Sequence, residues 1–438
     1  MPQPTPEFLA TAAPLLAWYY VLACALNVGA LVLAARGRHW IRAALWAGFA
    51  CGAGWLAAEA FAGRPLEMPV AWKASIDTAL GPVTFTAGTF FMLVVLFVGR
   101  RFFVIPAVAW TGFNAALLFL GASMADPQFA AIVAKPDNVP IVAMVFLLAG
   151  FTWWGTAQAV ENDDRIARGL GPVEADYAEP VLVWPEVIYL ELIIVVLATV
   201  VLIVWSMALQ APLEEPANPV VTPNPSKAPW YFLGLQEMLV FFDASIAGVT
   251  LPILIILGLA AIPYLDFNPK GNGYYTIKQR PFAYLTFQFG FLQLWILLIL
   301  IGTFMRGPNW NFFGLYEIRD PHKVLALNNV KLSEYFWVIW LGRSLPQAPP
   351  GGGPFLELGV ILWREIAGIV LLAVYFLAIP FLLGRTLLGE FRRRMGLVGF
   401  TIMTWLLLMM LMLPIKMFLR WTWNLSYIVS IPEYFANF

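Results

Sequence analysis

The chain has 438 residues, of which 61% are hydrophobic and only 12% charged, and its mean hydropathy is +0.77. Soluble proteins carry about a quarter charged residues, so this composition excludes a soluble enzyme, a nucleic-acid-binding protein and a disordered scaffold. The 26 basic and 26 acidic residues balance, so no polyanionic partner such as a nucleic acid is indicated. The chain is predicted to be an all-α integral membrane protein.

Ten segments are long and apolar enough to cross the roughly 30 Å hydrocarbon core of a bilayer. Helices are expected because they satisfy their backbone hydrogen bonds within one segment, where lipid offers no partner. In chain order the predicted transmembrane helices span residues 14–35, 43–62, 78–99, 102–124, 138–160, 184–209, 245–265, 283–304, 358–383 and 397–419. No basic leader precedes the first apolar run, so the first helix is expected to remain in the mature chain.

Basic residues are unevenly distributed between the loops on the two sides of the membrane. The loops of the richer side carry Arg36, Arg38, Arg42, Arg100, Arg101, Arg165, Arg168, Lys270, Lys278, Arg280, Arg385, Arg392, Arg393 and Arg394. Loops rich in Lys and Arg remain in the cytoplasm, so this side is predicted to be cytoplasmic. Both chain termini are therefore predicted to lie on the outer side.

Loop lengths and composition suggest how the chain is divided. Two long loops are predicted on the outer side, at residues 210–244 and 305–357, and the second ends in the flexible run PQAPPGGGP. A polar cytoplasmic linker at residues 161–183 follows a five-helix N-terminal membrane region, residues 1–160.

Few residues could hold a metal or a haem. Two b haems bound by paired histidines need four His on facing helices, and this chain has only His39 and His322. These two are predicted on opposite sides of the membrane. Cys24 and Cys51 stand singly, outside any CxxC or CxxCH pattern. No metal site is predicted, and the chain is not expected to ligate haem itself.

The first long outer loop contains PANPVVTPNPSKAPWYFLGLQEMLVFFD, residues 216–243. Its prolines suppress helix formation as far as Pro229, which suits a first helical turn. From Trp230 onward the pattern is helical, and Trp and Tyr are typical of the membrane interface. Two interpretations are open: an interfacial helix that precedes the next span, or a short helix that roofs a quinone cavity.

This region resembles the C-terminal domain of cytochrome b in quinol:cytochrome c oxidoreductases, and equally the separate subunit IV of the chloroplast and cyanobacterial cytochrome complex. ANPVVTPNPSKAPWYF resembles the family's run of N-P, T-P and PEWY, and IPYLDFNPKGNGYYTIKQRPFAY resembles its cytoplasmic loop between two spans. The resemblance covers residues 184–310, whose three spans would be the family's helices E, F and G. It extends more loosely through GTFMRGPNWNFFG over 311–438, an outer loop with two C-terminal spans. Residues 1–160 resemble no family and have no assigned role.

In the family, the PEWY element lines the quinol-oxidation site. Matched position by position, this chain reads Ala228, Pro229, Trp230 and Tyr231, so proline replaces the family's glutamate. The resemblance implies that quinol binds at Pro229, Trp230, Tyr231 and Phe232.

The family's glutamate is thought to accept a proton from quinol, and a proline cannot do so. Glu237, two turns along the same predicted helix, is the first candidate for this role, and Asp243 is the second. A carboxylate partly desolvated against apolar neighbours would have a raised pKa suited to accepting the proton.

The resemblance implies a membrane subunit of a bacterial bc-type quinol:cytochrome c oxidoreductase, located in the inner (cytoplasmic) membrane and not catalytic alone. It would form part of a shared quinol pocket at the outer face and contribute to the proton-motive force. The expected partners are a cytochrome b N-terminal subunit carrying the b haems, a Rieske protein with a 2Fe–2S cluster, a c-type cytochrome and lipids, in a complex expected to be dimeric. The alternative is a non-catalytic quinone-binding or anchor subunit of another respiratory complex, similar to polysulfide reductase, although that class does not call for the Pro-rich loop with PWY.

Overall fold

The computed structural model describes residues 4–177, 179–209, 216–268, 273–324, 328–349, 351–434 and 436–438, and the structural statements below concern these residues. Most of them are helical. Two short strands, β1 (Ser430–Ile431) and β2 (Ala436–Asn437), pair antiparallel near the C-terminus. The prediction of an all-α protein is confirmed.

Nine helices of the described residues are long and apolar enough to cross a membrane, and a bent pair makes a tenth candidate. The nine are α1 (Pro6–Arg36), α2 (Trp40–Phe61), α6 (Pro106–Ser123), α8 (Val139–Ala167), the span Val183–Ala208 with α9 (Ile188–Ala208), the span Ile246–Leu265 with α11 (Leu251–Leu265), the span Pro281–Met305 with α12 (Pro281–Phe287) and α13 (Leu297–Leu300), the span Ile366–Arg385 with α16 (Ile366–Ala373) and α17 (Ile379–Arg385), and α18 (Gly389–Trp423). The prediction of about ten transmembrane helices is confirmed.

Shorter helical pieces complete the chain. The α-helices among them are α3 (Val70–Ala79), α4 (Pro82–Val98), α5 (Arg100–Phe103), α7 (Pro127–Val133), α10 (Trp230–Met238), α14 (Leu332–Glu334) and α15 (Gly353–Arg364). The 3₁₀ and π turns are η1 (Val173–Tyr177), η2 (Val183–Val187), η3 (Ile246–Thr250), η4 (Gln288–Ile296), η5 (Ile301–Met305), η6 (Pro308–Trp310), η7 (Tyr335–Trp340), η8 (Val374–Ala378) and η9 (Pro432–Tyr434). The two long outer loops are thus partly helical, because α10, α14 and the start of α15 lie within them.

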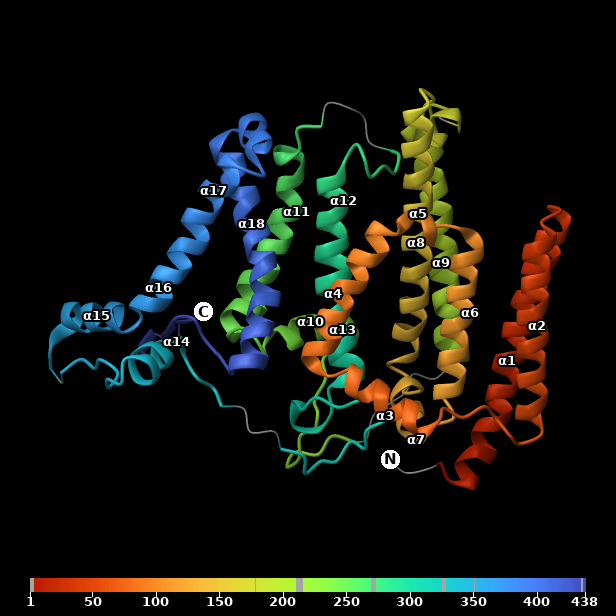
Figure 1. Cartoon of the computed structure of the whole chain (residues 1–438), viewed down its shortest axis with the longest axis horizontal. Helices are drawn as coiled ribbons and strands as arrows, with labels where there is room; N and C mark the ends of the chain where they lie inside the picture. Colours follow the sequence, from red (N-terminus) through yellow and green to blue (C-terminus); the bar gives the residue numbers. More distant parts are fainter. Residues whose placement is uncertain are drawn as a thin grey trace.

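The spans stand side by side in an elongated molecule (Figure 1). The α1–α2 hairpin forms one edge, and α16 to α18 form the other. The short helices α10, α14 and α15 lie toward the same end of the spans as both chain termini (Figure 1).

The predicted third span, residues 78–99, is wrong at its start. The chain bends by 82° between α3 and α4, so the apolar helix begins only at Pro82. Proline lacks an amide hydrogen and disfavours helical backbone in the preceding residue, which explains the break at this position. The separate α3 is held by a buried salt bridge of 2.5 Å between Lys73 and Asp126, which precedes α7.

The predicted ninth span, residues 358–383, also begins too early. Helix α15 ends at Arg364, Glu365 leaves helical geometry, and α16 begins at Ile366. The Glu365 carboxylate is buried, pairs with Arg364 at 3.1 Å and accepts a hydrogen bond from the Ser430 amide. A buried charge with satisfied oxygens therefore fixes the bend.

The largest core cluster lies between α10, the span Pro281–Met305 and α18. It includes Met238, Phe241, Leu298, Ile301 and Met412. This packing fixes the position of α10, which carries the predicted site residues.

Candidate functional site

The start of α10 is tied to the Pro-rich segment before it. Pro229 occupies the N-cap position, one residue earlier than the first-turn position expected for it. The Gln236 side-chain oxygen accepts from the Ala228 amide at 2.7 Å, and its amide group donates to the Ser226 carbonyl at 2.8 Å. One side chain of the helix therefore holds the segment that leads into it.

The first turn of α10 presents three adjacent aromatic side chains. Trp230, Tyr231 and Phe232 are 42%, 50% and 54% exposed. Their rings contact one another, with centroids 5.8 Å apart for the first pair and 4.8 Å for the second. Together with the exposed Pro229 they form one surface, which we call the aromatic face of α10. The predicted quinol-binding residues thus lie together and are accessible.

The opposite side of α10 packs against the span Pro281–Met305. Leu233 and Gly234 are buried there, and Gly234 faces Ile299 and Trp295. A Cβ at Gly302 would lie 2.8 Å from the Leu233 side chain, closer than real contacts allow, so the two helices approach to a distance that only glycine permits. The aromatic face therefore rests on a tightly packed base.

Glu237 is fully buried on this packed side, within a salt bridge to Arg306. Arg306 donates from Nη2 to Oε1 at 2.6 Å and from Nε to Oε2 at 3.0 Å. The Trp310 indole donates to Oε2 at 3.2 Å, and Arg306 Nη1 donates to the Trp310 carbonyl at 2.8 Å. This pair joins α10 to the segment that follows the span Pro281–Met305.

Two titratable groups at this end have shifted pKa values. Burial raises the pKa of Glu237, and the charge and hydrogen bonds of Arg306 oppose that shift. Burial, together with the nearby Arg319 charge, lowers the pKa of Lys227 to about 7. The Lys227 ammonium donates to the Thr303 carbonyl at 2.9 Å, so a group that titrates near neutral pH lies beside the start of α10.

Asp243 lies beyond α10 in a different environment. Its carboxylate accepts from the Ser245 amide and hydroxyl and from the Asn437 side chain. These hydrogen bonds, with that of the Ser245 amide the largest, lower its pKa. The raised pKa expected of a carboxylate here therefore holds in direction for Glu237 and is wrong for Asp243.

Sequence reasoning did not connect Arg306, Trp310 and Lys227 with the site. All three contact α10 or its supporting span in the structure. A usable signal was present, because Arg306 is the first charged residue after a 25-residue apolar span, and Glu237 is the one charged residue within α10. A charge that is buried among apolar helices is usually paired with an opposite charge, so two isolated opposite charges of this kind are candidates for a salt bridge.

Potential metal ligands are scattered among the residues that the structure describes. No group of three or more His, Cys, Asp or Glu among them is arranged to hold a metal. His39 precedes α2, His322 lies in an exposed turn after the span Pro281–Met305, and neither has a second histidine as an axial partner.

Residues 216–318 match the family model described as cytochrome b (C-terminal)/b6/petD. No curated protein and no solved structure matches the chain. The matched residues include the Pro-rich segment, α10, the span Pro281–Met305 and the Glu237–Arg306 pair. The match overlaps most of residues 184–310, which resemble the same family in sequence. It begins after α9, so it leaves that span out, and it ends eight residues beyond residue 310. The chain is therefore a multi-pass membrane protein in which residues 216–318 are similar to the C-terminal domain of cytochrome b.

Proposed function

We propose that the chain is a membrane subunit of a bacterial bc-type quinol:cytochrome c oxidoreductase, and that α10 forms one wall of its outer-side quinol-oxidation site. The observation that carries this proposal is the aromatic face of α10 within the segment that matches the cytochrome b family. Three half-exposed aromatic residues in succession suit a surface at the membrane interface that binds a flat apolar ligand.

Within this proposal, Trp230, Tyr231 and Phe232 contact the quinol ring and exclude water from one side of it. The chain leaves the aromatic face open, so a second wall comes from another subunit. The haem-bearing N-terminal half of cytochrome b is the proposed owner of that wall, and it and a Rieske protein accept the two electrons that quinol supplies. A c-type cytochrome completes the set of partners in a dimeric complex of the bacterial inner membrane.

Glu237 is proposed as the first proton acceptor. Its raised pKa suits the role, but both of its carboxylate oxygens now accept hydrogen bonds from Arg306. Glu237 is also fully buried on the side of α10 opposite the aromatic face, so proton acceptance requires Arg306 to move away and the Glu237 side chain to turn toward the quinol. Asp243, which is half-exposed and has a lowered pKa, suits passing a proton to outer water, and is the second candidate.

Purification of the intact complex in mild detergent through a tag on this chain tests the proposed function. We expect a reduced-minus-oxidised spectrum with b-haem absorbance, and mass spectrometry that identifies a Rieske protein and a cytochrome b half with four haem-ligating histidines. A haem-free preparation, or one with molybdopterin and cubane iron–sulfur subunits, would contradict it and support the anchor subunit.

Substitutions on the aromatic face test the site itself. Trp230→Ala and Tyr231→Ala should lower quinol oxidation while the b-haem absorbance of the complex is retained. Phe355→Ala is the matched control, because Phe355 is an exposed aromatic residue of α15 at the same end of the molecule. Loss of haem in the α10 variants, or equal loss of rate in the control, would mean that the aromatic face only maintains the structure.

Glu237→Gln tests the proton acceptor. The variant should slow quinol oxidation most strongly at low pH, where other bases in the site are already protonated. Asp243→Asn, measured in parallel, separates the two candidates. A rate for Glu237→Gln that equals wild type at every pH would exclude Glu237 as the acceptor.

A further inference from the structure

A cavity lies at the end of the molecule opposite α10, where a short loop joins α17 to α18. Its volume is about 710 Å³, and it is open at the surface. The cavity is lined by Gly384, Arg385, Thr386, Leu387, Gly389, Glu390, Arg392 and Arg393. The distribution of Lys and Arg predicts that this end faces the cytoplasm.

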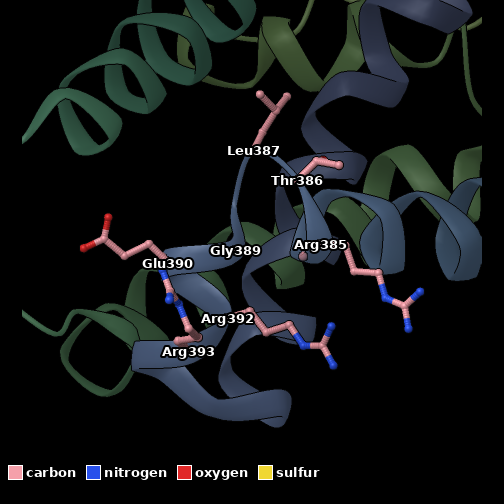
Figure 2. Close-up of a pocket in the computed structure, with 8 residues that line it drawn as sticks. Arg385, Thr386, Leu387, Gly389, Glu390, Arg392 and Arg393 are labelled. Carbon is pink, nitrogen blue, oxygen red and sulfur yellow. The ribbon is translucent and has the colours of Figure 1, made fainter.

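The lining of this cavity has an excess of positive charge. Arg385, Arg392 and Arg393 have no carboxylate partner among the residues that the structure describes. The one acidic lining residue, Glu390, pairs with Arg394 at 2.5 Å. Arg385 and Arg392 extend to the same side, and Glu390 extends to the other (Figure 2). The positive charge of Arg385 and Arg392 is therefore not balanced by a lining carboxylate.

An apolar groove adjoins the basic cavity. Its volume is about 210 Å³, and it is lined by Phe376, Leu377, Pro380, Phe381, Arg392, Leu397, Phe400, Thr401 and Trp405. Arg392 lines both hollows, so the groove continues from the basic cavity along α17 and α18. The Arg385 guanidinium lies 4.0 Å from the centroid of the Phe381 ring, at the junction of the two. The Trp405 indole donates to the Phe376 carbonyl at 2.8 Å and joins the groove's two helical walls.

We propose that the basic cavity and the apolar groove form a binding site for one anionic phospholipid. The phosphate contacts Arg385 and Arg392, because guanidinium groups bind phosphate through paired, charge-assisted hydrogen bonds. One acyl chain lies in the groove, beside the exposed Leu377 and Leu397. The site lies where two membrane spans end, at the depth of the lipid headgroups, and basic pockets between spans are typical lipid sites.

The groove distinguishes a lipid from free phosphate. A phosphate ion would need only the basic cavity, and it would gain nothing from nine groove residues that are mostly apolar. A zwitterionic lipid would fill the groove but would bring a cation toward three unpaired arginines. Only an anionic lipid complements both parts.

Native mass spectrometry of the tagged complex, delipidated in detergent and titrated with phosphatidylglycerol, phosphatidylcholine or inorganic phosphate, tests the site. We expect phosphatidylglycerol to bind most tightly. The double variant R385Q/R392Q should weaken it by about fivefold for each charge removed, since each basic residue near a lipid surface contributes roughly that factor. Arg36→Gln, which removes an exposed arginine at the end of α1 on the same predicted side, is the matched control and should leave binding unchanged.

Two further variants keep the test decisive if the double variant does not fold. Glu390→Gln removes the acidic lining residue and should tighten phosphatidylglycerol binding. Thr401→Phe fills the groove without changing the charge and should weaken the phospholipid but not inorganic phosphate. Equal binding of phosphatidylglycerol and phosphatidylcholine, equal binding of phosphatidylglycerol and inorganic phosphate, or wild-type affinity in these variants would overturn the proposal.

Discussion

Helix α9 and the span Pro281–Met305 are both apolar enough to cross the membrane, yet they are packed in opposite ways. No residue of α9 is buried, whereas 44% of the residues in the most apolar part of the span Pro281–Met305 are buried. The buried span carries polar residues that contact the rest of the chain, such as Gln293, which donates to Thr89 at 2.8 Å. In α9 the middle of the helix is almost all Val, Ile and Leu. Hydropathy therefore identifies a span, and the polar residues within it indicate whether it packs against its own chain.

The same contrast applies to the two sides of α10. The side that carries Glu237 is completed by residues of this chain, and the side that carries Trp230 is not. Residues of this chain thus cover the side of α10 that carries Glu237, whereas the described residues leave the aromatic face exposed.

The largest effect is expected from breaking the buried pair. Glu237→Ala leaves the Arg306 charge buried without its partner, which typically costs about 3–5 kcal/mol. The double variant E237L/R306M removes both charges and should recover much of that loss. The apparent melting temperature in detergent measures both. If the double variant is as unstable as the single one, the pair contributes through packing and not through charge.

A smaller loss is expected where α10 meets the span Pro281–Met305. Gly302→Ala introduces a Cβ that would lie 2.8 Å from the Leu233 side chain, and such overpacking typically costs about 1–3 kcal/mol. Gly248→Ala is the control, because a Cβ at Gly248 would have no neighbour within 4 Å. The same melting experiment should show a lower midpoint for the first variant only. A neutral Gly302→Ala would mean that α10 is held less tightly than its contacts indicate.

A third prediction concerns pH. The pKa of Lys227 is lowered from 10.5 to about 7, so between these two values the folded protein binds fewer protons than the unfolded chain. Stability from this group therefore rises as the pH increases from about 7 to 10.5. Lys227→Met should remove that rise, and Lys278→Met, which alters an exposed lysine, should leave it in place. Melting midpoints at several pH values would show parallel curves for Lys227→Met and wild type if the prediction is wrong.

Much of this fold could be predicted from the sequence because lipid constrains it strongly. A span must be long, apolar and helical, so eight of the ten predicted spans coincide with helices or their central parts, and the third and ninth begin too early. Local sequence does not specify a bend such as that between α3 and α4, since many prolines are accommodated within helices. The aromatic face could also be predicted, because its residues are adjacent in the chain and form part of a recognisable family motif.

The partner of Glu237 could not be predicted in this way. Arg306 lies 69 residues away, and the pairing depends on how closely α10 approaches the span Pro281–Met305. That approach depends in turn on Gly302, whose role is visible only when both helices are in place. Long-range polar pairs of this kind are set by tertiary packing, whereas the spans that bring them together are set by composition.

The smallest effect is expected from truncating an exposed leucine of α9. Leu197 is 59% exposed, and substitutions at such positions usually change stability by less than about 0.5 kcal/mol. The same truncation at Leu298, which is 1% exposed in the packed span, should cost about 2–5 kcal/mol. Melting of the purified chain without other subunits measures both. A large loss for Leu197→Ala in the purified chain would show that α9 packs against this chain after all; a loss that appears only in the intact complex would show that a partner subunit covers α9.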